Sequence, residues 1–452
     1  MKRFVVAIAS LAFIAAACTA GGDTTSIAPS AVDTVSHEPV TLTITGEWTG
    51  RECEQWKDIF PRFEDAYPWA TIEPQCNIGD NKAIAAINAG NPPDVVQSFG
   101  VDNVGLYCST GAWQDLNPYI TGPDGLDMSV FPSAVFTYTT FEDKQCALPF
   151  MTDTFGLYYN LDAFQEAGIS EPPTTTEELQ ADAAKLTKFN DDGSIAVAGF
   201  VPWIGYYCCG SNTLSFAHMF DASWLDESGQ PAFASDPGWA EMFHWQHDFI
   251  ADVYGDGDFA TGSDKLNTFV AGHGGEWAGR QDFITGRTAI TIDGEWRNAF
   301  INDFVPNLNY DTAPLPTSPD NVDVYGSGLV GGTVLALPKG SPHPNEAWLL
   351  LKWLATDTET LVYMANNVNN VPTTVESLTS PDLTLPPQFQ TFKDVFEDPN
   401  SAWRPTSVLG LQLADFIDAF AADWQVGDQT DLQGGLQTAQ EQTNDALAQS
   451  EV

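Results

Sequence analysis

Positively charged residues are scarce in this chain of 452 amino acids. Lys and Arg together number 17 against 61 Asp and Glu, which gives a formal net charge of −44 at pH 7. A surface with such an excess of carboxylates repels nucleic acids and anionic lipid head groups. The imbalance therefore excludes a nucleic-acid-binding function and indicates a strongly solvated surface.

Long hydrophobic runs are also missing. After residue 17 no apolar stretch reaches the 18 or so residues that a membrane-spanning helix needs. Residues 1–17 combine a Lys-Arg pair with a short apolar run, which is typical of a signal peptide. Small residues stand directly before Cys18, as at a bacterial lipoprotein processing site, so we expect Cys18 to carry the lipid and residues 18–38 to form a flexible tether. The alternative is ordinary secretory cleavage, with Cys18 lost.

Cysteines are few, seven in all. An even number remains once Cys18 is set aside, and in an exported protein this predicts disulfides. The candidates are Cys53, Cys76, Cys108, Cys146, Cys208 and Cys209. The simplest pairing joins Cys53 to Cys76 and Cys108 to Cys146. A bond between the adjacent Cys208 and Cys209 would be strained, because neighbouring Cα atoms lie only about 3.8 Å apart, and the sequence leaves that bond open.

Catalytic and cofactor signatures are absent as well. The sequence contains no Gly-x-Ser-x-Gly elbow, no His-Glu-x-x-His site and no nucleotide-binding Gly-Lys-Ser/Thr loop. His244 and His247 have a spacing that suits a metal, but no third ligand is evident. Residues 256–258 lack the remainder of a calcium-binding loop. We therefore expect no metal, no cofactor and no enzymatic activity.

What the sequence does contain is an alternation of strand and helix patterns. Residues 40–45 alternate apolar and polar side chains, and apolar residues from Trp56 to Phe63 follow at helical spacing. Thr175 and Glu178 form a capping box before another helix. The pattern predicts an α/β fold, and the length of the chain predicts two lobes or more.

Several predicted strands end in an aromatic residue beside a carboxylate or an amide. In open α/β sheets, ligands bind outside the carboxyl ends of strands. A sugar ring presents an apolar face that stacks on an aromatic side chain and hydroxyls that pair with carboxylates and amides. The strand ends are at Glu47-Trp48-Thr49, Phe99 with Asp102-Asn103, Trp203 with Tyr206, and Gly294-Glu295-Trp296.

A set of segments resembles, in family order, the extracellular solute-binding proteins of carbohydrate ABC transporters, in the broad maltose-binding-protein-like family. These segments are residues 89–96, 148–160, 164–179, 283–296 and 341–354. The resemblance implies a two-lobed periplasmic-binding-protein-like α/β fold with hinge strands and a ligand in the interlobe cleft. It implies a first lobe of residues 39–150 and 329–375 and a second lobe of residues 151–328 and 376–452.

The resemblance also implies a function: a monomer, anchored outside the membrane by its lipid, that binds a sugar or oligosaccharide and delivers it to the permease of an ABC importer. Together with the strand ends, it gives a set of ligand-contact candidates, with Trp296 as the stacking platform. They are Glu47, Trp48, Thr49, Phe99, Asp102, Asn103, Asp153, Trp203, Tyr206, Glu295, Trp296, Trp403 and Arg404.

Other interpretations remain open at this stage. Some of these tryptophans can belong to the core, as we expect for Trp348 and Trp353. Asp293 and Glu295 can cap a turn or pair with Arg297 instead of binding ligand. Trp277 follows a similar Gly-Gly-Glu stretch but is left outside the main set. The alternatives for function are an exported glycan-acting hydrolase, which needs two carboxylates, and a protein of the same fold that binds a polyamine or another non-sugar solute.

Overall fold

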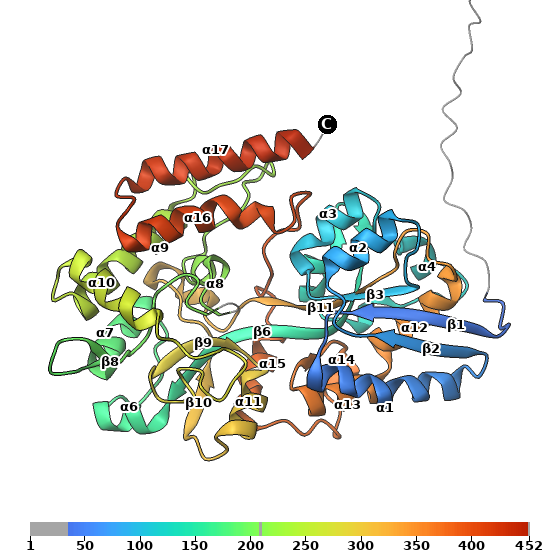
Figure 1. Cartoon of the computed structure of the whole chain (residues 1–452), viewed down its shortest axis with the longest axis horizontal. Coiled ribbons are helices and arrows are strands. Elements are labelled where there is room, and N and C mark those ends of the chain that lie inside the picture. The colour runs from blue at the N-terminus through green and yellow to red at the C-terminus, as the bar shows by residue number, and fades with distance from the viewer. Residues whose placement is uncertain (1–34, 208–209, 451–452) are drawn as a thin grey trace, which may run out of the picture.

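The computed structural model describes residues 35–207 and 210–450. It shows two lobes connected by long crossing strands, with the N-terminal lobe on the right of Figure 1 and the two C-terminal helices on the left. Within the described residues, no helix is long and apolar enough to cross a membrane. Residues 1–34, and with them Cys18, lie outside the described part of the chain.

The main sheet has eight strands, in the order β10-β6-β11-β3-β1-β2, with β12 and β9 also paired to β6. Its strands are β1 (Val40–Gly46), β2 (Ala70–Gln75), β3 (Val95–Ser98), β6 (Leu148–Asn160), β9 (Ile290–Gly294), β10 (Tyr310–Ala313), β11 (Val330–Ala336) and β12 (Val371–Pro372). β1 lies between β2 and β3 and is parallel to both. Two small ribbons pair β4 (Thr140–Phe141) with β5 (Lys144–Gln145) and β7 (Lys188–Phe189) with β8 (Ile195–Val197).

Strand β6 passes from one lobe to the other. Its first half pairs with β11 and β12, and its second half pairs with β9 and β10, all antiparallel. β6 and β11 lie side by side between the lobes (Figure 1). The expected hinge-connected, two-lobed α/β fold is confirmed.

Helices cover both lobes. They are α1 (Gly50–Ala66), α2 (Asp80–Asn88), α3 (Val104–Ser109), α4 (Asn117–Ile120), α5 (Phe136–Thr139), α6 (Leu161–Ala167), α7 (Thr176–Leu186), α8 (Thr213–Met219), α9 (Pro237–Phe249), α10 (Phe259–Val270), α11 (Arg297–Phe304), α12 (Pro344–Thr356), α13 (Thr358–Val368), α14 (Val375–Leu378), α15 (Gln390–Glu397), α16 (Gln412–Val426) and α17 (Leu432–Ser450). Shorter helical turns are Val101–Asn103, Met128–Val130, Ser133–Val135, Ile250–Tyr254, Pro319–Val324 and Pro387–Phe389.

Local sequence signals explain where two of these helices form. α1 buries Trp56, Ile59, Phe60 and Phe63 on one face, the stripe that the apolar spacing predicts. α7 begins with the predicted capping box: Thr175 Oγ1 accepts the Glu178 amide at 3.2 Å, and Glu178 Oε2 accepts the Thr175 amide at 3.4 Å.

Two clusters of buried side chains form the cores. The first covers the N-terminal lobe and continues along β6 to Phe392 and Phe396, and the second lies between the helices of the other lobe. Residues 376–452 were expected in the second lobe. In the structure, Phe392 and Phe396 of α15 belong to the first cluster, which also contains Tyr158 and Phe283 of the expected second lobe, and the chain from Leu409 onward belongs to the second cluster. The expected boundary between the lobes therefore stays a prediction.

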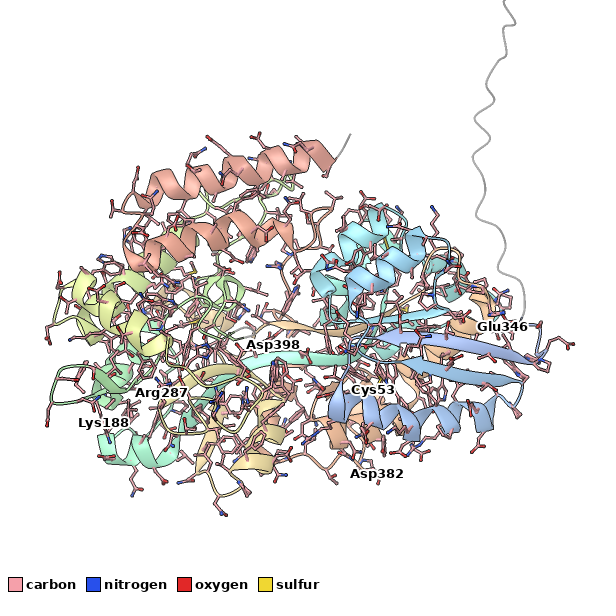
Figure 2. The ribbon with its side chains drawn as sticks, in the orientation of Figure 1. Cys53, Lys188, Arg287, Glu346, Asp382 and Asp398 are labelled. Atoms are coloured by element: carbon pink, nitrogen blue, oxygen red, sulfur yellow. A yellow bond between two sulfur atoms is a disulfide. The ribbon has the colours of Figure 1, made fainter. Side chains whose placement is uncertain are left out.

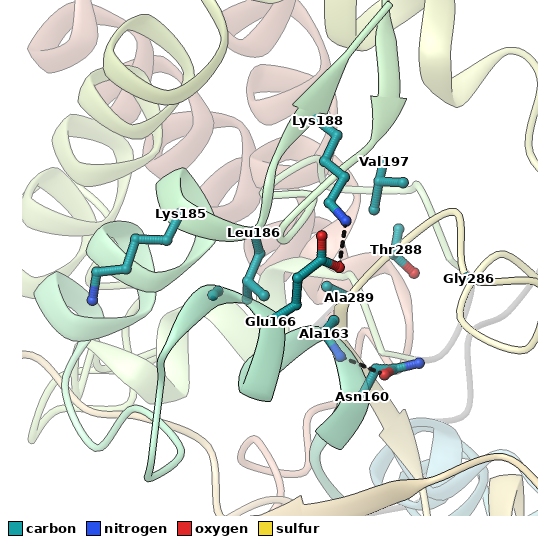
Figure 3. Close-up of a pocket in the computed structure, with 11 residues that line it drawn as sticks. Asn160, Ala163, Glu166, Lys185, Leu186, Lys188, Val197, Gly286, Thr288 and Ala289 are labelled. Atoms are coloured by element: carbon teal, nitrogen blue, oxygen red, sulfur yellow. Dashed lines mark hydrogen bonds and ion pairs between the residues drawn. The ribbon is translucent and has the colours of Figure 1, made fainter.

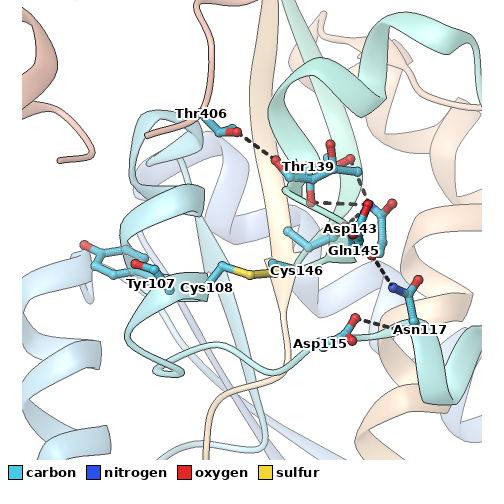
Figure 4. The surroundings of a disulfide bond; sticks show 12 residues. Tyr107, Cys108, Asp115, Asn117, Thr139, Asp143, Gln145, Cys146 and Thr406 are labelled. Carbon is cyan, nitrogen blue, oxygen red and sulfur yellow. Dashed lines mark hydrogen bonds between the residues drawn. A yellow bond between two sulfur atoms is a disulfide. The ribbon is translucent and has the colours of Figure 1, made fainter. Parts of the chain in front are cut away.

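Both expected disulfides in the described chain are present. Cys53 on α1 (Figure 2) bonds to Cys76, with Cα atoms 6.1 Å apart. Cys108 bonds to Cys146 across 5.8 Å, beside the short β4–β5 ribbon (Figure 4). The two bridges close loops of 23 and 38 residues within the first lobe, and such cross-links restrict the unfolded chain. Cys208 and Cys209 lie outside the described residues.

Candidate functional site

A cavity of about 560 Å³ opens where the lobes meet. Its volume falls in the range of about 300–1,000 Å³ that is usual for small-ligand sites. The residues lining it are Glu47, Trp48, Thr49, Glu52, Phe99, Asp153, Phe155, Asn212, Trp277, Trp296, Phe300, Asn370 and Trp403. Segments far apart in sequence therefore meet at one cavity, and β6 contributes Asp153 and Phe155 to it.

The first lobe contributes the turn between β1 and α1 to this cavity. Glu47 is held by two backbone amides: its Oε2 accepts from Phe99 N at 2.7 Å and its Oε1 from Asp80 N at 3.3 Å. Burial and then the negative charge of Asp80 raise the pKa of the Glu47 carboxyl. Trp48 is only 2% exposed and packs on Phe150, with ring centroids 5.2 Å apart. Trp48 is thus mainly a core residue with one edge at the cavity.

Five aromatic rings also line the cavity, and each ring packs next to the following one in space, so that together they form a row. We call them the aromatic row: Phe300, Trp277, Trp296, Phe155 and Trp403. Successive ring centroids are separated by 5.6, 6.2, 5.5 and 6.2 Å. A row of this kind offers apolar faces for stacking, as the interpretation of Trp296 requires.

Two glycines of the sheet make room for the aromatic row. A Cβ on Gly294, which pairs with Phe155 across β6 and β9, would lie 2.2 Å from the Trp296 ring. A Cβ on Gly331 of β11 would lie 2.8 Å from the Trp403 ring. Any larger residue at either position would push an indole ring out of place. The backbone therefore fixes both rings against the sheet.

Beneath the aromatic row lies a pair of carboxyl groups without a cation. The carboxyl groups of Asp153 and Glu295 share one donor, the side-chain amide of Asn370. Asn370 Nδ2 donates to both, to Asp153 Oδ1 at 2.5 Å and Glu295 Oε1 at 2.7 Å, and Thr154 N donates to Glu295 Oε2 at 2.8 Å. Burial raises the pKa of Asp153 to about 6, and burial followed by the charge of Asp153 raises that of Glu295. The cavity thus presents both a hydrogen-bond donor and acceptors at its floor.

This pair gives the stability of the protein a defined dependence on pH. A carboxyl group whose pKa is raised on folding binds more protons in the folded state, so its contribution to stability falls as pH rises from about 4 through about 6. Asp153→Asn cannot ionise. We expect this variant to lose less stability than the wild type between pH 4 and pH 8, by on the order of 2 kcal/mol, in denaturant unfolding at each pH.

The matched control is Glu227→Gln, which removes a carboxylate from an exposed turn. Its unfolding free energy should follow the wild-type pH profile. Parallel profiles for Asp153→Asn and the wild type would contradict a raised pKa of Asp153 in the folded protein.

Three predicted contact residues lie behind Trp403 rather than at the cavity. Asp102 Oδ1 accepts from Trp403 Nε1 and from Arg404 Nε, both at 2.6 Å. Arg404 is 9% exposed, and its guanidinium lies 5.2 Å from the centre of the Trp224 ring. Asn103 is buried and accepts the Leu411 amide at 3.1 Å. These residues hold Trp403 and the chain before α16 in position.

Trp203 and Tyr206 are placed differently from the expectation. Each is 6% exposed and packs in the second cluster, and neither lines the cavity. The Tyr206 hydroxyl donates to Asp282 Oδ2 at 2.5 Å. Glu295 likewise is fully buried and does not line the cavity, but it accepts a hydrogen bond from the lining residue Asn370. The remaining candidates, Glu47, Trp48, Thr49, Phe99, Asp153, Trp296 and Trp403, line the cavity.

Sequence reasoning did not select six of the lining residues. They are Glu52, Phe155, Asn212, Trp277, Phe300 and Asn370. Glu52 and Phe300 lie in the first turn of α1 and α11, the helices that follow the strand ends of β1 and β9. A rule that covers the first helical turn after each strand end, as well as the strand end itself, predicts both residues. Trp277 did carry a signal, because it follows the same Gly-Glu step as Trp296. Asn370 carried none, since a loop amide after a helix is common.

Two other cavities fit a ligand less well. One of about 190 Å³ in the second lobe lies beside the exposed ion pair between Lys188 and Glu166, whose atoms are 2.7 Å apart (Figure 3). It is small and has no aromatic lining. The other, about 450 Å³, lies behind Trp403 beside Trp224 and contains one acidic residue, Asp221. In the described ranges, no group of three or more His, Cys, Asp or Glu could hold a metal ion.

Residues 51–360 match the family model of the bacterial extracellular solute-binding proteins. The chain belongs to this family. The matched range runs from α1 into α13 and so includes parts of both lobes and the crossing strands β6 and β11. Family membership and the two-lobed fold agree with the resemblance seen in the sequence.

Three binding proteins align over 57–67% of the chain. The maltotriose-binding protein of Pyrococcus abyssi is 23% identical over 305 residues, 67% of this chain and 60% of the relative. The mannitol-binding protein of Pseudomonas aeruginosa is 26% identical over 317 residues, 67% and 66% of the two chains. A glycerol-3-phosphate-binding periplasmic protein of Yersinia enterocolitica is 26% identical over 275 residues, 57% and 55%. The chain thus spans 55–66% of these relatives' lengths.

Solved structures match the solute-binding fold over nearly the whole chain. CpMnBP1 with mannotriose bound superposes with a TM-score of 0.76 and 28% identity, covering 89% of this chain and 100% of that one. The sugar-binding protein MalE of Xanthomonas citri gives a TM-score of 0.73 with 19% identity, covering 91% and 98%. At that identity the second comparison shows the fold alone.

Proposed function

We propose that this protein is a non-catalytic receptor that captures a sugar or oligosaccharide between its lobes and delivers it to the permease of an ABC importer. The observation that carries the proposal is the aromatic row, which lines a cavity that also presents Glu47, Glu52 and Asp153. Stacking faces together with carboxylates match the two kinds of surface on a sugar. CpMnBP1, whose structures contain mannotriose and mannobiose, and the maltotriose-binding relative support the same ligand class.

The charges around the cavity argue against an anionic ligand such as glycerol 3-phosphate. Among the described residues that line it, none is Lys, Arg or His. The nearby guanidinium groups are engaged elsewhere: Arg51 pairs with Asp303, Arg297 with Asp293 and Arg404 with Asp102. A phosphate in this cavity would be desolvated beside carboxylates without a compensating cation, which is strongly unfavourable.

Ligand binding is testable with the soluble chain from residue 35 onward. Isothermal titration calorimetry should detect mannobiose, mannotriose, maltotriose or a related glycan, and chromatography of the incubated sugar should show no cleavage products. Glycerol 3-phosphate should not bind. A polyamine also suits carboxylates and aromatic rings, so spermidine belongs in the panel. Binding of spermidine with no binding of any sugar, or cleavage of the sugar, would contradict the proposal.

The proposed location is the outer face of the membrane, where the lipid on Cys18 holds the receptor near its permease. The signal-peptide pattern and the small residues before Cys18 support it. Mass spectrometry of the protein from the membrane fraction should find a lipid-modified Cys18 at the mature N-terminus. An unmodified N-terminus beyond Cys18 would refute the anchor and leave the binding function untouched.

A further inference from the structure

Trp277 is the most exposed large aromatic side chain at the cavity. It is 52% exposed, whereas Phe155 and Trp48 of the same lining are 4% and 2% exposed. Phe99, which lines the cavity from the first lobe, is also well exposed, at 46%. Exposed aromatic rings that converge on one cavity indicate a ligand-binding surface, because contact of these rings with water is unfavourable.

The loop that carries Trp277 is fixed to the protein body. Gly274 N donates to Asp282 Oδ1 at 3.1 Å, and Arg287 Nη1 and the Tyr206 hydroxyl hold the same carboxylate at 2.7 and 2.5 Å. Gly279 lies so close to Phe304 of α11 that a Cβ there would be 3.1 Å from the ring. Contacts at both ends of the loop thus hold the exposed indole ring in a defined place.

Trp277 and Trp296 occupy different depths of the aromatic row. Trp296 packs edge-on against Phe155, with centroids 5.5 Å apart, and Phe155 and Asp153 belong to the same strand, β6. Trp277 lies one ring further out, 6.2 Å from Trp296 and 5.6 Å from Phe300. A single sugar ring stacked on Trp296 beside the carboxyl pair leaves the Trp277 face uncovered.

Building on the proposed function, we propose that Trp277 is the stacking platform of an outer subsite, so the protein selects oligosaccharides over monosaccharides. The first sugar ring lies on Trp296 near Asp153, and a later ring of the same chain lies on Trp277. Trp277 then determines the preferred ligand length, while the carboxyl groups set the orientation of the first ring.

The test is a ladder of ligand lengths measured by calorimetry with the wild type and Trp277→Ala. Mannose, mannobiose and mannotriose form the first ladder, and glucose, maltose and maltotriose the second. Trp277→Ala should weaken binding of the longest sugar that binds by about 5- to 30-fold, the scale for losing an aromatic anchor. The shortest sugar that binds should change by less than about twofold.

Two further variants separate stacking from structure. Trp277→Phe keeps a ring face and should recover most of the affinity for the long sugar. Phe189→Ala removes another exposed aromatic, 45% exposed on β7, that does not line the cavity, and should leave binding unchanged.

Each outcome decides the matter. If Trp277→Ala loses the same affinity for sugars of every length, the outer subsite is wrong and Trp277 contacts the first sugar ring. No loss for the long sugar would overturn any role for Trp277 in binding. If the wild type binds sugars but prefers the monosaccharide, the subsite is wrong and the proposed function stands. If it binds no sugar of either ladder, the proposed function itself fails.

Discussion

Replacing Trp296 with alanine is expected to weaken sugar binding by about 1–3 kcal/mol, or roughly 5- to 150-fold, because it removes the central ring of the aromatic row. The indole lies over Gly294 and meets Phe155 edge-on, with part of its surface open to the cavity. The free energy of unfolding should change less than the affinity, since a partly exposed ring contributes less to the core. Calorimetry and denaturant unfolding of the same preparation measure both quantities.

Trp348→Ala is the matched control for this variant. Trp348 is 1% exposed in the first cluster, and its Nε1 donates to Asp124 O at 3.0 Å. Its removal should lower the free energy of unfolding by about 3–5 kcal/mol through the cavity it leaves, while the folded protein keeps nearly wild-type affinity. If Trp296→Ala shows the pattern expected for Trp348→Ala, Trp296 is a core residue and not a platform.

Arg297→Met should be among the most destabilising single substitutions in the second lobe, costing about 3–5 kcal/mol. Arg297 and Asp293 are both 0% exposed, and Arg297 Nε donates to Asp293 Oδ2 at 2.5 Å. Arg297 also donates to the Tyr207 hydroxyl, which itself donates to Asp293 Oδ1 at 2.8 Å. Methionine fills similar space but leaves a buried carboxylate without its cation. Chemical denaturation at pH 7 measures the loss.

Two comparisons make the interpretation specific. Arg62→Met breaks an ion pair with Glu359 at 3.4 Å whose side chains are 34% and 85% exposed, and should cost no more than about 1 kcal/mol. The double variant Arg297→Met/Asp293→Asn should recover much of the loss, because no charge is then left buried alone. A double variant as unstable as Arg297→Met would show that the charge imbalance is not the cause.

The fold follows from the sequence because its signals are local and repeated. The stripe from Trp56 to Phe63, the capping box at Thr175 and the alternation of strands with helices each depend on a few neighbouring residues. The packing of α15 on β6 was not foreseeable in this way. Phe392 meets Tyr158, at 5.6 Å between ring centroids, through a contact that spans more than 200 residues.

The candidate site was predictable to a smaller extent. Strand ends located Glu47, Phe99 and Trp296, because the sheet brings its carboxyl ends together whatever the side chains are, and the family resemblance added Asp153. The same rule selected Trp203 and Tyr206, which turn inward to the second cluster. An aromatic residue after a strand satisfies a core as readily as a cavity, and only the three-dimensional packing decides between them.

The most direct test of the account is an experimental structure of the protein with the sugar that binds most tightly in the panel. The account predicts one sugar ring stacked on Trp296 and hydroxyl groups within hydrogen-bond distance of Glu47 and Asp153, in the cavity between the lobes. A sugar bound against Trp203 and Tyr206, or on the surface away from β6, would contradict it.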